Sequence, residues 1–209
     1  MNKPIILIGN GGHASVLTEI LLEEKRKIIG FTSPQNEKNR YCIPYIGEDH
    51  EIFQFNRNEI ELVLGVGSVN NSMLRQKLYN YFKDRGYIFT NVIHPHSIVS
   101  PSVQIGEGVQ IMAGSIIQTS TMLADNIIVN TGAKVDHDCK IESHVHIAPG
   151  VVISGGVTVK EGTHIGTGST IIQGITIGMN CLVGAGAVVT KNVRENVKVI
   201  GVPAKEVNL

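Results

Sequence analysis

Residues 147–171 read IAPGVVISGGVTVKEGTHIGTGSTI, with Ile147, Ile153, Val159, Ile165 and Ile171 at every sixth position. The same spacing of aliphatic residues runs without a miss from residue 99 to residue 189. A period of six fits neither the helical repeat of about 3.6 nor the strand alternation of about 2. It indicates a repeat architecture in which each hexad is one structural unit.

A second column of residues supports this interpretation. Three positions after most of the aliphatic residues stands a residue type that tolerates positive φ. These residues are Gly108, Gly114, Asn126, Gly132, Asp138, Gly150, Gly156, Gly162, Gly168, Gly174, Asn180, Gly186 and Asn192. Each hexad is therefore expected to form a short strand and a corner, and three hexads to close a triangular coil.

The pattern resembles the left-handed parallel β-helix of the hexapeptide-repeat acyltransferases. The ending VGAGAVVTK at residues 183–191, followed by GVPAK at residues 201–205, is similar to the coenzyme A signature of that family. The resemblance implies an all-β C-terminal domain that binds acetyl-CoA.

Composition excludes several classes of function. The chain has 209 residues, with 18 basic and 18 acidic side chains and no basic run, which argues against nucleic acid as a partner. No apolar run approaches the roughly 20 residues of a membrane span, and no secretory signal is evident, so a cytoplasmic location is expected. The 3 cysteines form no disulfide framework, and we interpret them as reduced and structural.

The N-terminal part has the pattern of a nucleotide-binding βαβ unit. Residues 4–8 predict a buried strand, which runs into the turn Gly9-Asn-Gly-Gly-His-Ala14 and then into a helical pattern. Gly9, Gly11 and Ala14 satisfy the spacing G-x-G-x-x-G/A, in which glycine lets the backbone approach a pyrophosphate. A second strand, residues 27–31, is followed by Thr32 and Ser33 instead of the acid that binds ribose in NAD enzymes. NAD is therefore not expected.

The next segments complete a small α/β domain. We expect a polar loop at residues 34–45, a short helix at 48–56, a strand at 61–66 and an amphipathic helix at 70–84. Residues 65–68, Gly-Val-Gly-Ser, form a second glycine turn at a strand end. Because the carboxyl ends of strands hold the ligand in such sheets, the two glycine turns are expected to converge. The predicted domains are a Rossmann-like domain at 1–94 and a left-handed β-helix at 95–209.

This pairing of domains resembles the PglD- and NeuD-like sugar acetyltransferases over essentially the whole chain. The resemblance implies that the N-terminal domain holds the nucleotide of a nucleotide-linked amino sugar. It also implies a homotrimer in which a neighbouring subunit supplies the catalytic histidine. One departure is that Thr32 and Ser33 replace an acidic pair of some relatives, which puts the base or ribose contact in question.

His137 is the candidate general base. It is the third residue of its hexad and is expected to point outward near a corner, with Gly155 one coil above. A glycine there would leave space for a thioester and a bare N–H for its oxygen. A histidine can accept the proton of an attacking amine, and a neighbouring carboxylate fixes its tautomer. The resemblance assigns this pair to His137 and Asp138; Asp136 is the other candidate, and a plain surface histidine is the alternative.

One outward-facing column contains Ile128, His146, His164 and Leu182. This column is too apolar for open solvent, so we expect it to be buried against the β-helix of a neighbouring subunit. The resemblance places His146 near acetyl-CoA. Alternatively, His144, His146 and His164 resemble the zinc site of γ-class carbonic anhydrases, although the other ligand spacing of that family is missing.

The sequence thus predicts acetyl transfer from acetyl-CoA, without a metal, to the amine of a nucleotide-linked amino-dideoxy sugar of the UDP-4-amino type. The alternatives are a sugar O-acetyltransferase such as one acting on sialic acid, a zinc lyase and an inactive scaffold. The predicted acetyl-CoA residues are His146, Gly155, Thr167, Ala185, Lys191, Pro203 and Lys205. The predicted nucleotide-sugar residues are Gly9, Asn10, Gly11, Gly12, His13, Gly67, Ser68 and Asn130.

Overall fold

The computed structural model describes residues 3–68 and 73–207. The chain forms two compact units, one of Met1–Gly67 with Lys77–Val92 and one of Ser68–Gln76 with Ile93–Leu209. Ser68 and residues 73–76 thus group with the β-helix, although residues 77–92 of the first unit separate them from it in sequence. The domain boundary predicted between residues 94 and 95 stays a prediction. None of the helices in the described ranges is long and apolar enough to cross a membrane.

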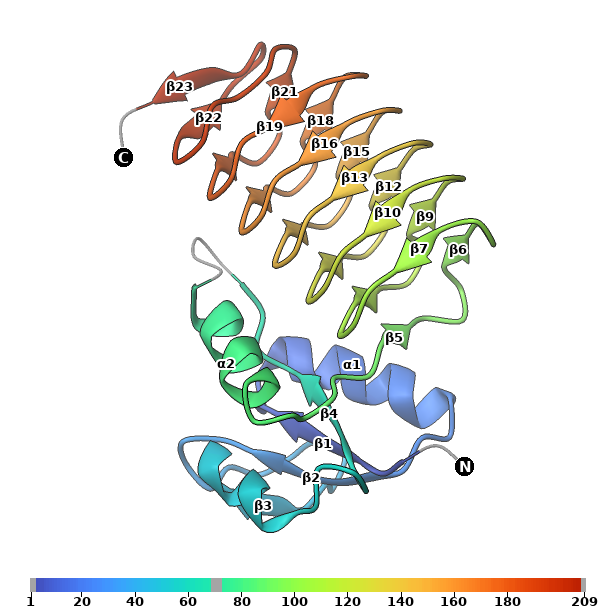
Figure 1. The fold of residues 1–209 in the computed structure, drawn as a ribbon, viewed down its shortest axis with the longest axis vertical. Helices are drawn as coiled ribbons and strands as arrows, with labels where there is room; N and C mark the ends of the chain where they lie inside the picture. The colour runs from blue at the N-terminus through green and yellow to red at the C-terminus, as the bar shows by residue number, and fades with distance from the viewer. Residues whose placement is uncertain (1–2, 69–72, 208–209) are drawn as a thin grey trace. The chain divides into compact units, whose positions relative to one another are not determined.

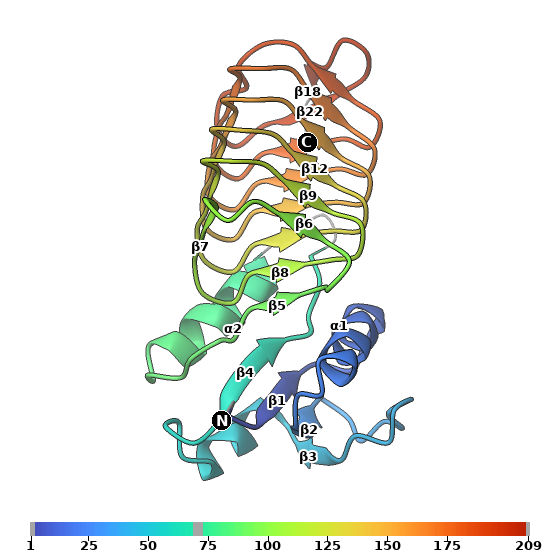
Figure 2. The same ribbon diagram turned by 90° about the vertical axis from the view of Figure 1, so that its right-hand side faces the viewer.

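The first unit is built on a parallel sheet with the strand order β3-β2-β1-β4. The strands are β1 (Ile5–Ile8), β2 (Ile28–Thr32), β3 (Tyr45–Gly47) and β4 (Glu61–Leu64). Figure 2 shows α1 (Gly12–Glu23) and α2 (Met73–Lys83) on opposite sides of this sheet. Tyr79 and Phe82 of α2 share a buried cluster with Ile6 and Ile8 of β1. The apolar faces of sheet and helices thus form the core expected of a Rossmann-like unit.

Three local predictions in this unit need correction or restriction. The loop predicted at residues 34–45 ends one residue early, because Tyr45 begins the edge strand β3 and pairs with Phe31 of β2. The predicted short helix is the 3-10 helix η1 (Asp49–Gln54). Residues 70–72 of the predicted amphipathic helix lie outside the described residues.

The two glycine turns follow β1 and β4, which are neighbours in the sheet. Gly65 lies so close to α1 that a Cβ atom built on it would be 2.7 Å from Cβ of Ala14. A Cβ on Gly9 would be 3.2 Å from the side chain of Val66. The expected convergence of the two turns is therefore confirmed.

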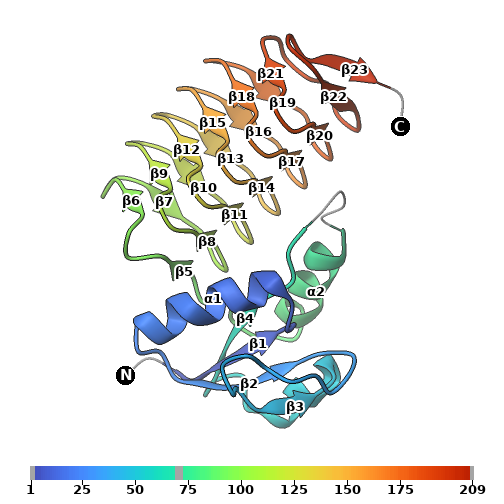
Figure 3. The same cartoon turned by 180° about the vertical axis from the view of Figure 1, so that it is seen from behind.

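The second unit is a left-handed parallel β-helix with three sheets (Figures 1 and 3). The strands of the coils pair in parallel one coil apart, as His146 does with His164 and Ile147 with Ile165. The last strand, Lys205–Val207, instead pairs antiparallel with Lys198–Ile200. The triangular coil of 18 residues is thus confirmed. Val109, Ile111, Val129, Ile147 and their equivalents on other coils fill the interior.

We name the three sheets after one strand each. The β14 sheet contains β5 (Val92–Ile93), β8 (Gln110–Ile111), β11 (Ile128–Val129), β14 (His146–Ile147), β17 (His164–Ile165), β20 (Leu182–Val183), β22 (Lys198–Ile200) and β23 (Lys205–Val207). The β12 sheet contains β6 (Ile98–Val99), β9 (Ile116–Ile117), β12 (Lys134–Val135), β15 (Val152–Ile153), β18 (Thr170–Ile171) and β21 (Val188–Val189). The β13 sheet contains β7 (Gln104–Ile105), β10 (Met122–Leu123), β13 (Lys140–Ile141), β16 (Thr158–Val159) and β19 (Thr176–Ile177).

The corner column has the predicted backbone, with one exception. All the predicted corner residues have positive φ except Asn192, near the end of the β-helix, where Asn196 has positive φ instead. Ser120 and His144 occupy the same column with φ of 59° and 64°. Their N–H groups and those of their neighbours bond to the adjacent coil, as that of Asp138 does to the Thr119 carbonyl at 3.1 Å. These bonds hold the left-handed corner even where the residue is not glycine.

Candidate active site

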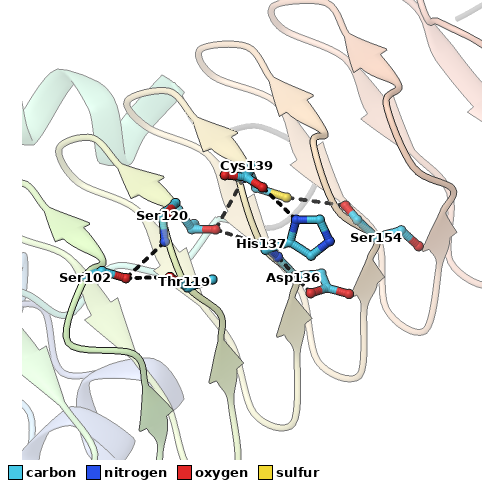
Figure 4. Close-up of polar contacts among 9 residues, drawn as sticks. Ser102, Thr119, Ser120, Asp136, His137, Cys139 and Ser154 are labelled. Atoms are coloured by element: carbon cyan, nitrogen blue, oxygen red, sulfur yellow. Dashed lines mark hydrogen bonds and ion pairs between the residues drawn. The ribbon is translucent and has the colours of Figure 1, made fainter.

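His137 lies at the exposed corner between β12 and β13, and both flanking aspartates contact it. Its Nδ1 is 2.7 Å from Oδ2 of Asp138, and its backbone N–H donates to Oδ1 of Asp136 at 2.8 Å. Asp138 has a φ of 57°. Figure 4 shows His137 beside Asp136, Cys139 and Ser154. Asp138 therefore contacts the imidazole, whereas Asp136 fixes the backbone.

The imidazole ring of His137 lies against the backbone of Gly155. A Cβ atom built on Gly155 would be 2.6 Å from both Cε1 and Nε2 of the ring. The carbonyl of His137 accepts the N–H of Gly156 at 2.9 Å. At least part of the space left by the missing side chain, which was expected to admit a thioester, is thus occupied by the imidazole itself.

The aspartates also set the protonation of His137. The hydrogen bond to Asp138, and then the charge of Asp136, raise its pKa above the ordinary value of 6.5. Because an ionised Asp138 can only accept, Nδ1 carries the proton in the neutral ring. The lone pair is then on Nε2, which can take a proton.

A second polar group forms on the β14 sheet. Nδ1 of His146 is 2.6 Å from Oγ and 2.9 Å from the carbonyl oxygen of Ser68, and its Nε2 is 3.2 Å from Nδ2 of Asn130. The Nδ1–H tautomer satisfies both sides, because it donates to the carbonyl of Ser68 and accepts from the amide of Asn130. Ser68 and His146 are 78 residues apart, so sequence patterns gave no sign of this contact.

The glycine turn of the first unit has open space beside it. A Cβ on Gly11 or Gly12 would meet no atom within 4 Å, whereas one on Gly67 would be 3.5 Å from His13. Oδ1 of Asn10 accepts a hydrogen bond from Nδ2 of Asn39 at 2.8 Å. Asn39 is thus a further residue at this turn, which the sequence analysis missed because it lies in the loop before β3.

Family models and solved structures agree on the relationship of this chain. The model described as PglD N-terminal domain matches residues 4–82, and the bacterial transferase hexapeptide model (six repeats) matches residues 156–191. A histidine-to-asparagine variant of perosamine N-acetyltransferase from Caulobacter crescentus, solved with CoA and GDP-perosamine, is 36% identical. Its TM-score is 0.92, with 98% of this chain and 97% of that chain covered.

The chain belongs to the hexapeptide-repeat sugar acetyltransferases with a PglD N-terminal domain. The acetyltransferase domain of PglB from Neisseria gonorrhoeae, solved with acetyl coenzyme A, is 32% identical, with a TM-score of 0.92 and coverage of 99% of this chain and 100% of that chain. WeeI from Acinetobacter baumannii AYE, at 23% identity and a TM-score of 0.87, shares the fold, with coverage of 99% and 100%. No curated protein matches the chain.

In this acetyltransferase the column containing His146 is partly covered by the chain itself. Ile128 is 0% and His146 8% exposed, which corrects the expectation that a neighbouring subunit must cover these two residues. His164 packs edge-on against His146 with ring centroids 4.7 Å apart, and burial lowers the pKa of His164. His144 contacts Asn126, with 2.9 Å between Nδ1 and Nδ2. In the described part of the chain, no three His, Cys, Asp or Glu side chains form a metal site, so the zinc alternative has no ligand set there.

The two segments of the coenzyme A signature lie side by side in the acetyltransferase. A Cβ on Gly184 would be 2.7 Å from the side chain of Ile200, and the N–H of Ala204 donates to the carbonyl of Val188 at 2.8 Å. Five of the predicted acetyl-CoA residues are exposed here or on nearby coils: Thr167, Ala185, Lys191, Pro203 and Lys205. Their contact with the coenzyme remains a prediction.

Gly155→Ala is expected to lower kcat by about 10²-fold, since a displacement of a reacting group by about 1 Å has that effect. The added methyl would push the His137 ring from its position. Gly155 does not have positive φ, so the fold should be retained, with an unchanged melting temperature. Steady-state kinetics of Gly155→Ala, His137→Ala and the double variant test this. If the double variant is much worse than His137→Ala, Gly155 acts by a route other than the ring.

Proposed function

We propose that this acetyltransferase transfers the acetyl group of acetyl-CoA to the amine of a nucleotide-linked amino-dideoxy sugar, with His137 as general base. The observation that carries this proposal is the Nδ1 bond of His137 to Asp138, which leaves the Nε2 lone pair at an exposed corner. The complexes of related enzymes with acetyl coenzyme A and with CoA and GDP-perosamine support the choice of substrates.

The proposed reaction is direct transfer in a ternary complex. The amine nitrogen attacks the thioester carbonyl, and Nε2 of His137 accepts the proton that the nitrogen loses. Asp138 stabilises the resulting imidazolium through Nδ1–H. The tetrahedral intermediate then expels the coenzyme A sulfur, which takes a proton to become the thiol, and leaves the amide.

The acceptor's nucleotide is proposed to bind at the turn formed by residues 9–13. Open space beside Gly11 and Gly12 and the nearby N-terminus of α1 support this placement. The sequence resemblance favoured a UDP-linked 4-amino sugar. Because a related enzyme was solved with GDP-perosamine, a GDP-linked sugar is the second acceptor to test.

Release of the coenzyme A thiol should be measured with UDP-linked and GDP-linked 4-amino sugars, and with sialic acid as a hydroxyl acceptor. The proposal expects turnover with an amino sugar that carries a nucleotide, and little with the free amino sugar. Turnover of sialic acid alone would replace the proposal by O-acetylation. Absence of thiol release with every acceptor would contradict acetyl transfer to these sugars.

We also propose that two subunits of a homotrimer form each site. Within the described residues His137 makes no hydrogen bond to Asn130 or His146, and these groups lie at different positions around the coil. Sedimentation should therefore give three times 22.6 kDa.

Co-expressing His137→Ala with Asn130→Ala should restore about a quarter of the sites, because random trimers place an intact His137 next to an intact Asn130 that often. The separately purified variants are the control and should be nearly inactive. A stable monomer of 22.6 kDa, or no recovery in co-purified mixed trimers, would contradict a shared site.

A further inference from the structure

The carboxyl end of β2 carries two hydroxyls, and both are used inside the protein. Oγ1 of Thr32 donates to Oδ1 of Asp49 at 2.6 Å, and Oγ of Ser33 donates to the carbonyl of Gln35 at 2.8 Å. Both residues are buried. In this arrangement neither hydroxyl is available to a ligand at the strand end.

Asp49 instead brings a carboxylate to this edge of the sheet. Its partner Thr32 pairs with Ile8 of β1, and the Thr32 carbonyl accepts the N–H of Gly9 at 2.9 Å. Asp49 is therefore one hydrogen bond away from the residue that flanks the glycine turn. It is half-buried, and its second oxygen, Oδ2, accepts no hydrogen bond from the described residues. The N-cap of η1 is Glu48, without a side-chain cap bond, and Asp49 is the first residue of this helix.

The loop between β2 and β3 is fixed along the same edge. Asn39 donates to Asn10 of the glycine turn at 2.8 Å, and its Oδ1 accepts the N–H of Tyr41 at 2.8 Å and of Ile43 at 3.2 Å. The glycine turn, this loop and Asp49 thus adjoin the carboxyl ends of β1 and β2, where parallel sheets bind their ligands.

We propose that Asp49 binds the ribose hydroxyls of the acceptor's nucleotide through Oδ2, while Thr32 holds Oδ1 in position. In dinucleotide-binding folds an acid that follows the second strand does this. Here the acid comes from η1 and reaches the strand end through Thr32. The inference rests on the proposed function, in which the nucleotide occupies the glycine turn.

Calorimetric titration of the full chain with UDP, GDP and their 2′,3′-dideoxy analogues tests this. The wild type should bind at least one ribonucleotide about 10- to 100-fold more tightly than its dideoxy analogue, as expected for a hydrogen bond to a charged group. Asp49→Asn keeps the shape and an acceptor for Thr32 but replaces Oδ2 by a group that cannot accept. It should lose affinity for the ribonucleotide alone, so that the discrimination disappears.

Two further variants sharpen the test. Thr32→Val keeps the carboxylate but removes the bond that holds it, so a smaller loss for the ribonucleotide alone is expected. Glu48→Gln changes the neighbouring exposed carboxylate and should leave all the affinities unchanged.

The outcomes separate this inference from the proposed function. If the wild type binds ribonucleotide and dideoxynucleotide equally, the assignment of Asp49 is wrong while the nucleotide site stands. If Asp49→Asn alters only the preference between UDP and GDP, the carboxylate contacts the base and the ribose assignment is again wrong. If the wild type binds neither nucleotide, the placement of the acceptor at the glycine turn fails as well.

Discussion

His137→Ala is expected to lower kcat by about 10²- to 10⁴-fold, the usual contribution of general acid-base catalysis. The side chain of His137 is 56% exposed and lies outside the interior cluster, so the melting temperature should not change. Acetyl-CoA affinity should also be nearly unchanged, because the base acts on the amine. Single-turnover measurements at saturating substrates separate this step from product release.

A variant that keeps the wild-type kcat at neutral pH would show that the base is elsewhere. His146 would be the next histidine to replace, although both of its ring nitrogens already have partners in the chain. A loss of thermal stability in His137→Ala would instead show that the ring supports the corner.

Asp138 should shift the pH dependence of kcat. The proposed mechanism needs the neutral imidazole, so activity should fall as the pH drops through the pKa of His137. Because Asp138 and Asp136 raise this pKa, the acid limb should lie above that of an ordinary histidine. Asp138→Asn removes the main cause of the shift and should move the limb to lower pH, with a smaller loss of kcat than His137→Ala. Asparagine tolerates the φ of 57° at this corner, so backbone strain does not confuse the comparison.

The acceptor can also contribute to the acid limb of the pH profile, because its ammonium group must lose a proton before the amine attacks. Only the limb that moves in Asp138→Asn belongs to His137. If no limb moves, the hydrogen bond between Asp138 and His137 does not control the catalytic proton.

Gly11→Val is expected to abolish binding of the acceptor's nucleotide while acetyl-CoA still binds. Gly11 has φ of −80° and ψ of −172°, which valine adopts without strain, and an added Cβ would meet no protein atom within 4 Å. The new side chain would therefore occupy only the space proposed for the pyrophosphate. Calorimetry with the nucleotide sugar and with acetyl-CoA measures the two affinities separately.

Gly11→Ala serves as the matched control and should give a smaller loss, because its single methyl fills less of that space. Unchanged nucleotide affinity in Gly11→Val would mean that the glycine turn only shapes the fold. Gly65 is unsuitable for such a test, since a Cβ there would be 2.7 Å from Cβ of Ala14 and would disturb the packing of α1.

The β-helix could be predicted from the sequence because its structural rule is periodic. The sixth-position aliphatics fill the interior, and glycine, asparagine or aspartate marks most of the corners. Ser120 and His144 were missed because hydrogen bonds to the neighbouring coil hold positive φ at residue types other than glycine, asparagine and aspartate. Asn196 was missed because it does not follow the six-residue spacing of the other corners. The strand β3 was missed for a related reason, since pairing with β2 and not its own pattern defines it.

In the candidate site, contacts between sequence neighbours could be predicted, and contacts between distant segments could not. His137 and Asp138 are adjacent in sequence, so their pairing could be expected, but only the geometry showed which aspartate contacts Nδ1. The bonds between Ser68 and His146 and between Thr32 and Asp49 join distant segments, and no local pattern encodes them.

Because the coils of the β-helix are equal in length, the number of residues between two positions gives their separation along the helix axis. From His137 to Ala185 are 48 residues, between two and three coils. With adjacent strands about 4.8 Å apart, this is about 13 Å along the axis. Inserting one whole coil between these points would keep every corner and every inward aliphatic in register, yet would lengthen the span by one strand spacing. The number of coils thus sets how far His137 lies from the C-terminal signature and, under the roles proposed for these two sites, the length of acyl carrier that fits between them.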